Sequence, residues 1–217
     1  MNNFLNINEI SQKNLKAILE DANTVKNGSG SKDNYINCLR NSIAGLLFEK
    51  PSTRTRLSFE AAVLKLGGQV LNLRKDEIHF GQGETLQDTS AMVSLFLDVL
   101  VLRLYDEEKL YEFARYSKIP IVNGLTNESH PCQVLTDVFT FQEIRGSITG
   151  KKVVWLGVAN NVFQSFLHAA VAFNFHIVFS GPEKFQPSEK MLKSIEKNNF
   201  NLFTIEPNPI TAVESAD

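Results

Sequence analysis

Four residues that could bind a phosphate or another oxyanion stand together in the sequence: Ser52, Thr53, Arg54 and Thr55. They follow an apolar segment and open a helical pattern, and the first turn of a helix offers unpaired backbone N–H groups and the positive end of the helix dipole. Their hydroxyl groups can cap the helix, and Arg54 can add a charge-assisted contact. Because the Walker pattern G-x-x-x-x-G-K-[ST] is absent, the residues alone allow either a different phosphate site or a well-capped helix with its arginines in solvent.

Three further polar residues follow later apolar segments. Arg103 ends one of them, and His130 and Gln133 come after the next and open another helical pattern. A histidine can donate a hydrogen bond to an oxyanion that develops during a reaction, and a glutamine amide can both donate and accept. Taken singly, Arg103 is also typical of a surface charge at a strand end, and a histidine before a proline is typical of a turn.

The elements that must position these residues alternate along the chain. Apolar runs that are too short for helices predict strands, and segments with apolar residues at helical spacing predict helices between them. This alternation predicts the α/β class, with doubly wound parallel sheets. The predicted strands span 43–48, 69–73, 99–103, 119–122, 152–156, 176–180 and 200–204, and the predicted helices span roughly 8–26, 59–66, 86–97, 106–117, 131–145, 161–173 and 188–198.

Two consequences follow from this order. The stretch 146–151 (GSITGK) separates a long helix from a new strand, so we expect two domains, 1–147 and 148–217. Ser52, Arg103 and His130 each stand at the carboxyl end of a different predicted strand, and the carboxyl ends of parallel strands meet at one edge of a sheet. We therefore expect these three residues to converge.

The composition excludes several classes of protein. Formal net charge is −2 without a long basic run, which argues against binding to nucleic acid, and no apolar run is long enough for a membrane span. The two cysteines, Cys38 and Cys132, form no C-x-x-C pair, so neither a zinc ribbon nor a dithiol site is predicted. The start lacks a secretory pattern, and we expect a cytoplasmic protein. A Rossmann-type nucleotide binder is a weak alternative, since G-x-G-x-x-G follows none of the predicted strands.

Two long strings carry a resemblance to a known family. FEKPSTRTRLSFE (48–60) and HPCQVLTDVFT (130–140) resemble the two carbamoyl-phosphate signatures of the aspartate/ornithine carbamoyltransferase family, and the FEK and HPCQ forms resemble its ornithine branch. The resemblance implies transfer of a carbamoyl group from carbamoyl phosphate to the δ-amine of L-ornithine, which gives L-citrulline and phosphate. It also implies a homo-oligomer, a trimer, and a reaction without metal, cofactor or covalent intermediate.

The resemblance assigns roles to single residues. The phosphate would be held by Ser52, Thr53, Arg54 and Thr55, the carbonyl group would be polarised by Arg103 and His130, and the carbamoyl nitrogen would be bound by Gln133. Asn161 would bind the carboxylate of ornithine, while Asn160 alone reads as a helix cap.

The sequence departs from the family at three of its positions. His79 stands where the ornithine branch usually has the glutamine that reaches a neighbouring subunit's phosphate site, and it could replace that contact or be a solvated loop residue. Gln82 stands where a basic residue is common, and Val158 where an aspartate is usual. These departures put the contact between subunits and the substrate side of the second domain in question.

The chain stops at Asp217, before the family's Ser-Met-Gly loop and final helix, so we expect an incomplete second domain with an exposed sheet edge. One alternative is therefore a truncated protein that binds carbamoyl phosphate or phosphate without catalysis, and a reading frame that continues past Asp217 would argue against it. Another alternative, an aspartate carbamoyltransferase, is opposed by the FEK and HPCQ forms and by the pair Asn160-Asn161.

Overall fold

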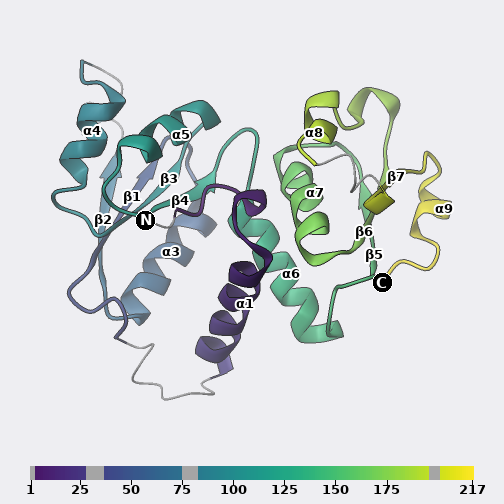
Figure 1. Ribbon diagram of the computed structural model, residues 1–217, viewed down its shortest axis with the longest axis horizontal. Coiled ribbons are helices and arrows are strands. Elements are labelled where there is room, and N and C mark those ends of the chain that lie inside the picture. The colour runs from purple at the N-terminus through teal and green to yellow at the C-terminus, as the bar shows by residue number, and fades with distance from the viewer. Residues whose placement is uncertain (1–2, 28–36, 75–82, 196–200) are drawn as a thin grey trace. The chain divides into compact units, whose positions relative to one another are not determined.

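The computed structural model of the protein describes residues 3–27, 37–74, 83–195 and 201–217. Its contacts divide the chain into two compact units (Figure 1): unit 1 comprises Met1–Leu5 and Ala17–Asn127, and unit 2 comprises Asn6–Lys16 and Glu128–Asp217. This division rests on contacts, and the predicted domain boundary at 147/148 stays a proposal based on the sequence. No helix in the described part of the chain is long and apolar enough to cross a membrane.

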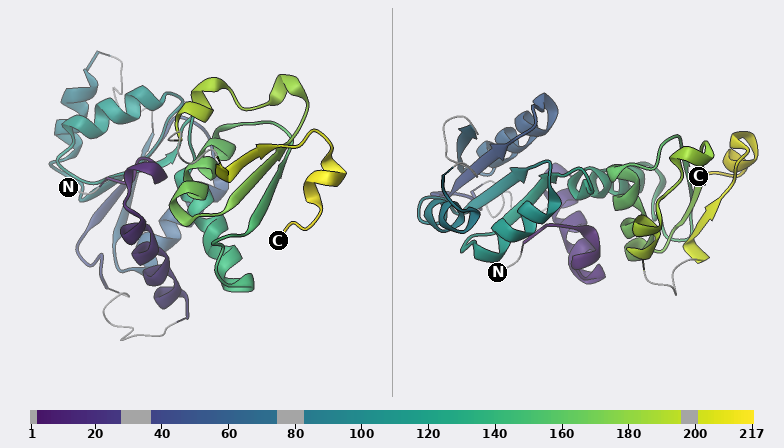
Figure 2. Two further views of the ribbon diagram at one scale, coloured as in Figure 1. Left: turned by 45° about the vertical axis from the view of Figure 1, so that its right-hand side comes forward. Right: turned by 90° about the horizontal axis from the view of Figure 1, so that it is seen from above.

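Unit 1 is built on a parallel four-stranded sheet with the order β2-β1-β3-β4. Its strands are β1 (Ile43–Phe48), β2 (Gln69–Arg74), β3 (Val99–Arg103) and β4 (Ile121–Leu125), and its helices include α3 (Thr53–Lys65), α4 (Leu86–Val93) and α5 (Glu107–Tyr116). Figures 1 and 2 show α3 on one face of the sheet and α4 and α5 on the other. In the register of β1 and β3, Phe48 pairs with Arg103, so the two strands end side by side.

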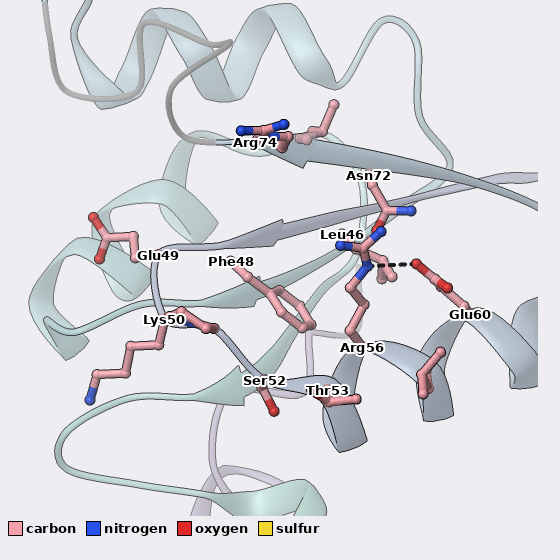
Figure 3. A pocket seen from close by; sticks show the side chains of 13 residues that line it. Leu46, Phe48, Glu49, Lys50, Ser52, Thr53, Arg56, Glu60, Asn72 and Arg74 are labelled. Atoms are coloured by element: carbon pink, nitrogen blue, oxygen red, sulfur yellow. Dashed lines mark hydrogen bonds and ion pairs between the residues drawn. The ribbon is translucent and has the colours of Figure 1, made fainter.

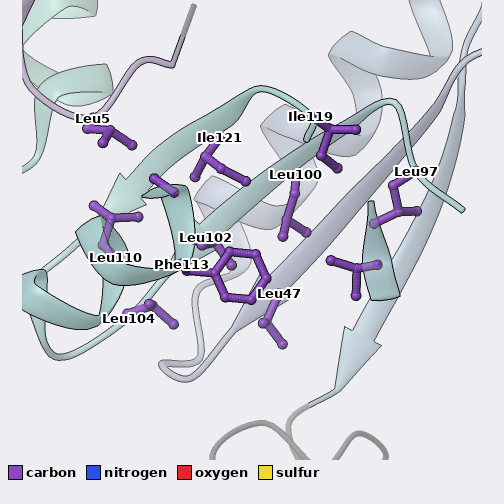
Figure 4. Packing of buried hydrophobic residues seen from close by; sticks show 12 residues of the cluster. Leu5, Leu47, Leu97, Leu100, Leu102, Leu104, Leu110, Phe113, Ile119 and Ile121 are labelled. Atoms are coloured by element: carbon purple, nitrogen blue, oxygen red, sulfur yellow. The ribbon is translucent and has the colours of Figure 1, made fainter. Parts of the chain in front are cut away.

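The core of unit 1 explains why its central strands are continuous apolar runs. Both faces of the sheet are covered, so successive side chains are buried whichever way they point. On the face covered by α4 and α5, Leu47, Leu100, Leu102 and Phe113 are at most 1% exposed and pack in one cluster (Figure 4). Burying a side chain of this size contributes about 1.5–3 kcal/mol, so this cluster is what holds the strand ends in place.

The last strand of this sheet differs from its prediction. β4 begins at Ile121, two residues after the predicted start, and it continues through Asn123 and Gly124, which locally favour a turn. The chain's first described residues override that preference, since Phe4 N–H donates to Ile121 O at 2.8 Å and Asn123 N–H donates to Phe4 O at 2.8 Å. The side chain of Asn123 also donates to Leu5 O at 2.9 Å.

Unit 2 contains a second parallel sheet, with the order β5-β6-β7. Its strands are β5 (Lys152–Leu156), β6 (His176–Ser180) and β7 (Phe203–Ile205), and its helices are η1 (Ile7–Glu9), α6 (Pro131–Arg145), α7 (Asn161–Phe173), η2 (Glu183–Phe185), α8 (Glu189–Lys193) and α9 (Pro209–Val213). Figures 1 and 2 show α7 and α9 on opposite sides of β5 and β6. The two parallel sheets with their flanking helices confirm the predicted α/β class.

Aromatic side chains fill the space between α7 and this sheet. Phe163, at the start of α7, is fully buried, and its ring centroid lies 5.5 Å from that of Trp155, 5.2 Å from Phe179 and 6.1 Å from Phe203. Tilted and edge-on ring pairs at these distances add stabilisation beyond their buried area. One residue of α7 thus contacts an aromatic ring on each of the three strands.

An N-terminal segment completes unit 2. The helix α1 (Gln12–Asn27) begins in unit 2 and ends in unit 1. Ahead of it, Asn6 Oδ1 accepts a hydrogen bond from Ile7 N–H at 3.0 Å and lies 3.0 Å from Nδ1 of His168, a buried residue of α7. The other ring nitrogen of His168 lies 2.9 Å from Oγ of Ser194. This polar chain joins segments that are far apart in the sequence.

Candidate active site

The turn from β1 into α3 has the local structure of an anion site. Ser52 is the N-cap of α3, with extended backbone angles (φ −157°, ψ 103°), and its hydroxyl oxygen accepts a hydrogen bond from Thr55 N–H at 3.3 Å. Ser52 therefore satisfies one of the unpaired N–H groups of the first turn and leaves others available, together with the positive end of the helix dipole. The structure thus bears out the predicted capping by Ser52.

Arg103 brings a cation to the same turn from the neighbouring strand. Its Nη1 donates to the hydroxyl oxygen of Thr55 at 3.1 Å. Its Nε is buried, and no group in the described part of the chain accepts a hydrogen bond from it. Burial lowers the pKa of Arg103, and no carboxylate contributes to that shift. A guanidinium group with an unused buried donor, held beside a helix N-terminus, is suited to an oxyanion ligand.

A cavity of about 910 Å³ opens beside this turn (Figure 3). Its lining includes Ser52, Thr53 and Arg56 from the turn and α3, and Asn72 and Arg74 from β2. The guanidinium Nε of Arg56 donates to Glu60 Oε1 at 2.8 Å, and this bond and one from Asn72 lower the pKa of Glu60. Arg54 is exposed and is not part of the lining.

The predicted residues His130 and Gln133 lie in unit 2, at the start of α6. His130 occupies the N-cap position, its side chain makes no capping hydrogen bond, and its backbone N–H donates to Ser165 Oγ on α7 at 2.9 Å. Gln133 is exposed, and its Nε2 donates to Asp137 Oδ1 at 2.8 Å. Burial raises the pKa of Asp137, and the bond from Gln133 partly offsets that effect. The remaining amide oxygen of Gln133 can accept a hydrogen bond from a substrate NH₂ group.

The two asparagines at the start of α7 occupy different helix positions. Asn160 is the N-cap, and its Oδ1 accepts from Val162 N–H at 3.0 Å and from Phe163 N–H at 3.1 Å. This confirms the predicted capping role of Asn160. Asn161 is the first residue of the helix and is half-buried. In the turn before it, Val158 O accepts a hydrogen bond from Trp155 Nε1 at 3.0 Å, a backbone contact that does not need the family's aspartate.

The structure therefore brings together some of the predicted residues. Ser52, Thr55 and Arg103 meet in unit 1, which also carries Thr53 and Arg54. Unit 2 carries His130, Gln133 and Asn161 at the starts of two helices. The convergence of the two groups stays a prediction, while His79 and Gln82 lie outside the described residues. Among the described residues, no three His, Cys, Asp or Glu side chains are grouped as they would be in a metal site.

The residues that support the turn could not be identified from the sequence. Lys50 lies within FEKPSTRTRLSFE (48–60), but nothing in that segment indicates what Lys50 contacts. Its partners are Tyr105 and Asn127, which follow β3 and β4. Only the strand order, with β3 between β1 and β4, brings the turns after those three strands within reach of one another.

Comparisons with known proteins agree with this arrangement. Residues 2–143 match the carbamoyl-P binding domain of aspartate/ornithine carbamoyltransferases, and residues 149–217 match their Asp/Orn binding domain. The ornithine carbamoyltransferase of Ruegeria pomeroyi is 41% identical over 221 residues, which covers 100% of this chain and 71% of the relative.

Two solved structures extend the likeness to the fold. The ornithine carbamoyltransferase of Burkholderia thailandensis matches with a TM-score of 0.92 at 32% identity, over 100% of this chain and 73% of the other. That of Pyrococcus furiosus matches with a TM-score of 0.91 at 35% identity, over 99% of this chain and 69% of the other. The chain therefore belongs to the aspartate/ornithine carbamoyltransferase family, a family of transferases, and its similarity is to members named ornithine carbamoyltransferase.

Proposed function

We propose that the protein transfers the carbamoyl group of carbamoyl phosphate to the δ-amine of L-ornithine, giving L-citrulline and phosphate. The neutral amine nitrogen forms a bond to the carbonyl carbon, the bond from that carbon to the phosphate oxygen breaks, and the proton released by the amine leaves with phosphate. Positioning and charge stabilisation supply the catalysis, because both substrates are reactive once they are held together.

The phosphate half of this proposal rests on unit 1. Ser52, Thr53, Arg54 and Thr55 would hold the phosphate through hydroxyl groups, backbone N–H groups and one guanidinium group. Arg103 would contact both the phosphate and the carbonyl oxygen, whose negative charge grows in the transition state. The single observation that carries the proposal is the Arg103 guanidinium group, bonded to Thr55 and without an acceptor for its buried Nε among the described residues.

The remaining roles are assigned to unit 2 and to a neighbouring subunit. His130 would donate to the carbonyl oxygen, Gln133 would bind the carbamoyl nitrogen through its amide, and Asn161 would bind the ornithine carboxylate. His79 would reach the phosphate site of a neighbouring subunit in a homotrimer. A cytoplasmic location and a place in arginine metabolism belong to the same proposal.

Citrulline formation by the purified chain tests the reaction directly. Carbamoyl phosphate is supplied with L-ornithine, and L-aspartate serves as the control amine. The Arg103→Met variant is expected to lower kcat/KM about a hundredfold or more, because it removes a donor to the developing oxyanion. Arg115→Met, which changes an exposed arginine at the end of α5, is the matched control and should leave the rate unchanged.

The outcomes separate the alternatives. Citrulline formed from L-ornithine, with no product from L-aspartate, supports the proposal, and product from L-aspartate alone would make the protein an aspartate carbamoyltransferase. Absence of product with either amine, combined with carbamoyl phosphate binding that Arg103→Met abolishes, would reduce the function to binding. Equal rates in the Arg103→Met variant and the original chain would refute the assigned site.

A further inference from the structure

The turn that carries the anion-binding groups is fastened to the turn that follows β3. Glu49 N–H donates to Arg103 O at 2.8 Å. In the other direction, the backbone N–H of Tyr105 donates to Glu49 Oε2 at 3.0 Å. These two bonds fix the first residue after β1, but they leave the next three residues before α3 to other contacts.

Lys50 supplies a further contact through its side chain. Its Nζ donates to Asn127 Oδ1 and lies 4.5 Å from the centroid of the Tyr105 ring. The backbone N–H of Asn127 in turn donates to Tyr105 O at 3.0 Å. The three residues therefore form one connected group that joins the turns after β1, β3 and β4, and we name it the Lys50 brace.

The direction of the Lys50 side chain distinguishes the brace from the anion site. Figure 3 shows the side chain of Lys50 extending away from Ser52 and Thr53. The side chain thus carries the ammonium group away from the N-terminus of α3, where the helix dipole disfavours a cation. The face of the Tyr105 ring and the amide oxygen of Asn127 stabilise the ammonium group instead.

We propose that Lys50 is a positioning residue, held by Tyr105 and Asn127, that fixes the turn 49–52 so that the N-terminus of α3 and Arg103 face the same anion. The inference rests on the proposed function, because the anion is the phosphate of carbamoyl phosphate or inorganic phosphate. The Lys50 ammonium group does not bind that anion itself. It holds the backbone that does.

Four variants of the whole chain test this role. Lys50→Met removes the ammonium group, Lys50→Arg keeps a cation that can stack on the ring, and Tyr105→Leu removes the ring while Lys50 stays. Lys109→Met, which changes an exposed lysine of α5, is the matched control. Calorimetric titration with carbamoyl phosphate and with inorganic phosphate gives Kd at several salt concentrations, and amide hydrogen exchange without ligand reports on the turn.

Lys50→Met and Tyr105→Leu are each expected to raise Kd about fivefold, while Lys50→Arg restores most of the affinity. The slope of log Kd against log salt concentration should stay unchanged in Lys50→Met, because the charge lost is not a ligand of the anion. The backbone amides of Glu49 and Tyr105 should exchange about tenfold faster in both variants and not in Lys109→Met.

Three results would overturn the inference, and they differ from one another. A shallower salt slope in Lys50→Met would make Lys50 a direct ligand. If Kd and amide exchange are unchanged in Lys50→Met and Tyr105→Leu while the original chain binds normally, the Lys50 brace does not position the turn. The proposed function would then stand without it. If the original chain binds neither anion, the proposed function fails and the inference fails with it.

Discussion

Replacing His168 by glutamine should remove the part of the acid sensitivity of unit 2 that this buried histidine causes. His168 is 2% exposed, and burial lowers its pKa from 6.5 to about 4. Asn6 Oδ1 already accepts a hydrogen bond from Ile7 N–H, so it acts as an acceptor towards His168 as well. The proton of the neutral ring therefore lies on Nδ1, and Nε2 can accept from the hydroxyl group of Ser194.

The sign of the effect follows from the direction of the pKa shift. Above pH 6.5, His168 is neutral in both the folded and the unfolded chain, and its pKa shift costs nothing. Between pH 6.5 and about 4 the unfolded chain binds a proton that the folded chain does not, so the free energy of unfolding falls as the pH falls. The full interval corresponds to about 3 kcal/mol.

This magnitude is an upper bound for a structural reason. Oγ of Ser194 lies 2.6 Å from Met191 O as well as 2.9 Å from Nε2 of His168, and its single hydrogen can turn towards either. When Nε2 is protonated it can donate to Ser194, which then donates to Met191. Because the protonated ring keeps a hydrogen bond on each nitrogen, only desolvation opposes the charge.

The assay uses the only tryptophan of the chain, Trp155, whose ring contacts α7 and therefore reports on unit 2. Urea unfolding of the original chain and of His168→Gln is followed by its fluorescence at pH 7.5, 6.5, 5.5 and 4.5. Other titrating groups are common to both proteins and cancel in the difference. The difference between the free energies of unfolding of the two proteins should shrink by about 2–3 kcal/mol towards low pH. A difference that does not change with pH would refute the assignment of a buried neutral histidine.

Three further substitutions test unit 2. A β-carbon added at Gly181 would lie 2.2 Å from the carbonyl oxygen of Gly157, so Gly181→Ala should lower the free energy of unfolding by about 1–3 kcal/mol in the same urea assay, and an unchanged midpoint would show that the two turns separate easily. Asn160→Ala should cost about 1 kcal/mol through loss of the α7 cap. Asn161 Oδ1 also accepts from Val162 N–H at 3.0 Å, so Asn161→Ala should cost some stability too. On the proposed function, Asn161→Ala should raise KM for ornithine while Asn160→Ala does not, and the reverse pattern in the two KM values would exchange the two roles.

The elements of the fold that could be predicted are those with a local cause. α6 begins at Pro131, which suits the first helical position, and α7 begins after the capping Asn160, so the predicted ranges of both helices match the structure. Predicted ends without such a signal were less accurate. α4 stops at Val93, four residues before its predicted end, because Ser94 to Phe96 form turns.

The residues of the candidate site also differ in whether the sequence alone could identify them. The capping Ser52 and the strand-end Arg103 could be found from residue type and position, since both depend on a helix start and a strand end that the sequence marks. The contacts of Lys50 could not be found, because they depend on strand order, and the turn after β1 reaches Tyr105 only because β3 is its neighbour. Likewise, nothing near His168 in the sequence indicates that its partner is Asn6.

The pairing of Asn6 with His168 has a consequence for the order in which the protein can be completed. The two residues are 162 positions apart, and a ribosome that adds roughly 5–20 residues per second needs on the order of ten to thirty seconds to cover that distance. Unit 1 could gather its strands during this time, whereas Asn6–Lys16 must wait for α7 before unit 2 can close. Residues Asn6–Lys16 are thus made well before the rest of unit 2 and are among the last to find their place.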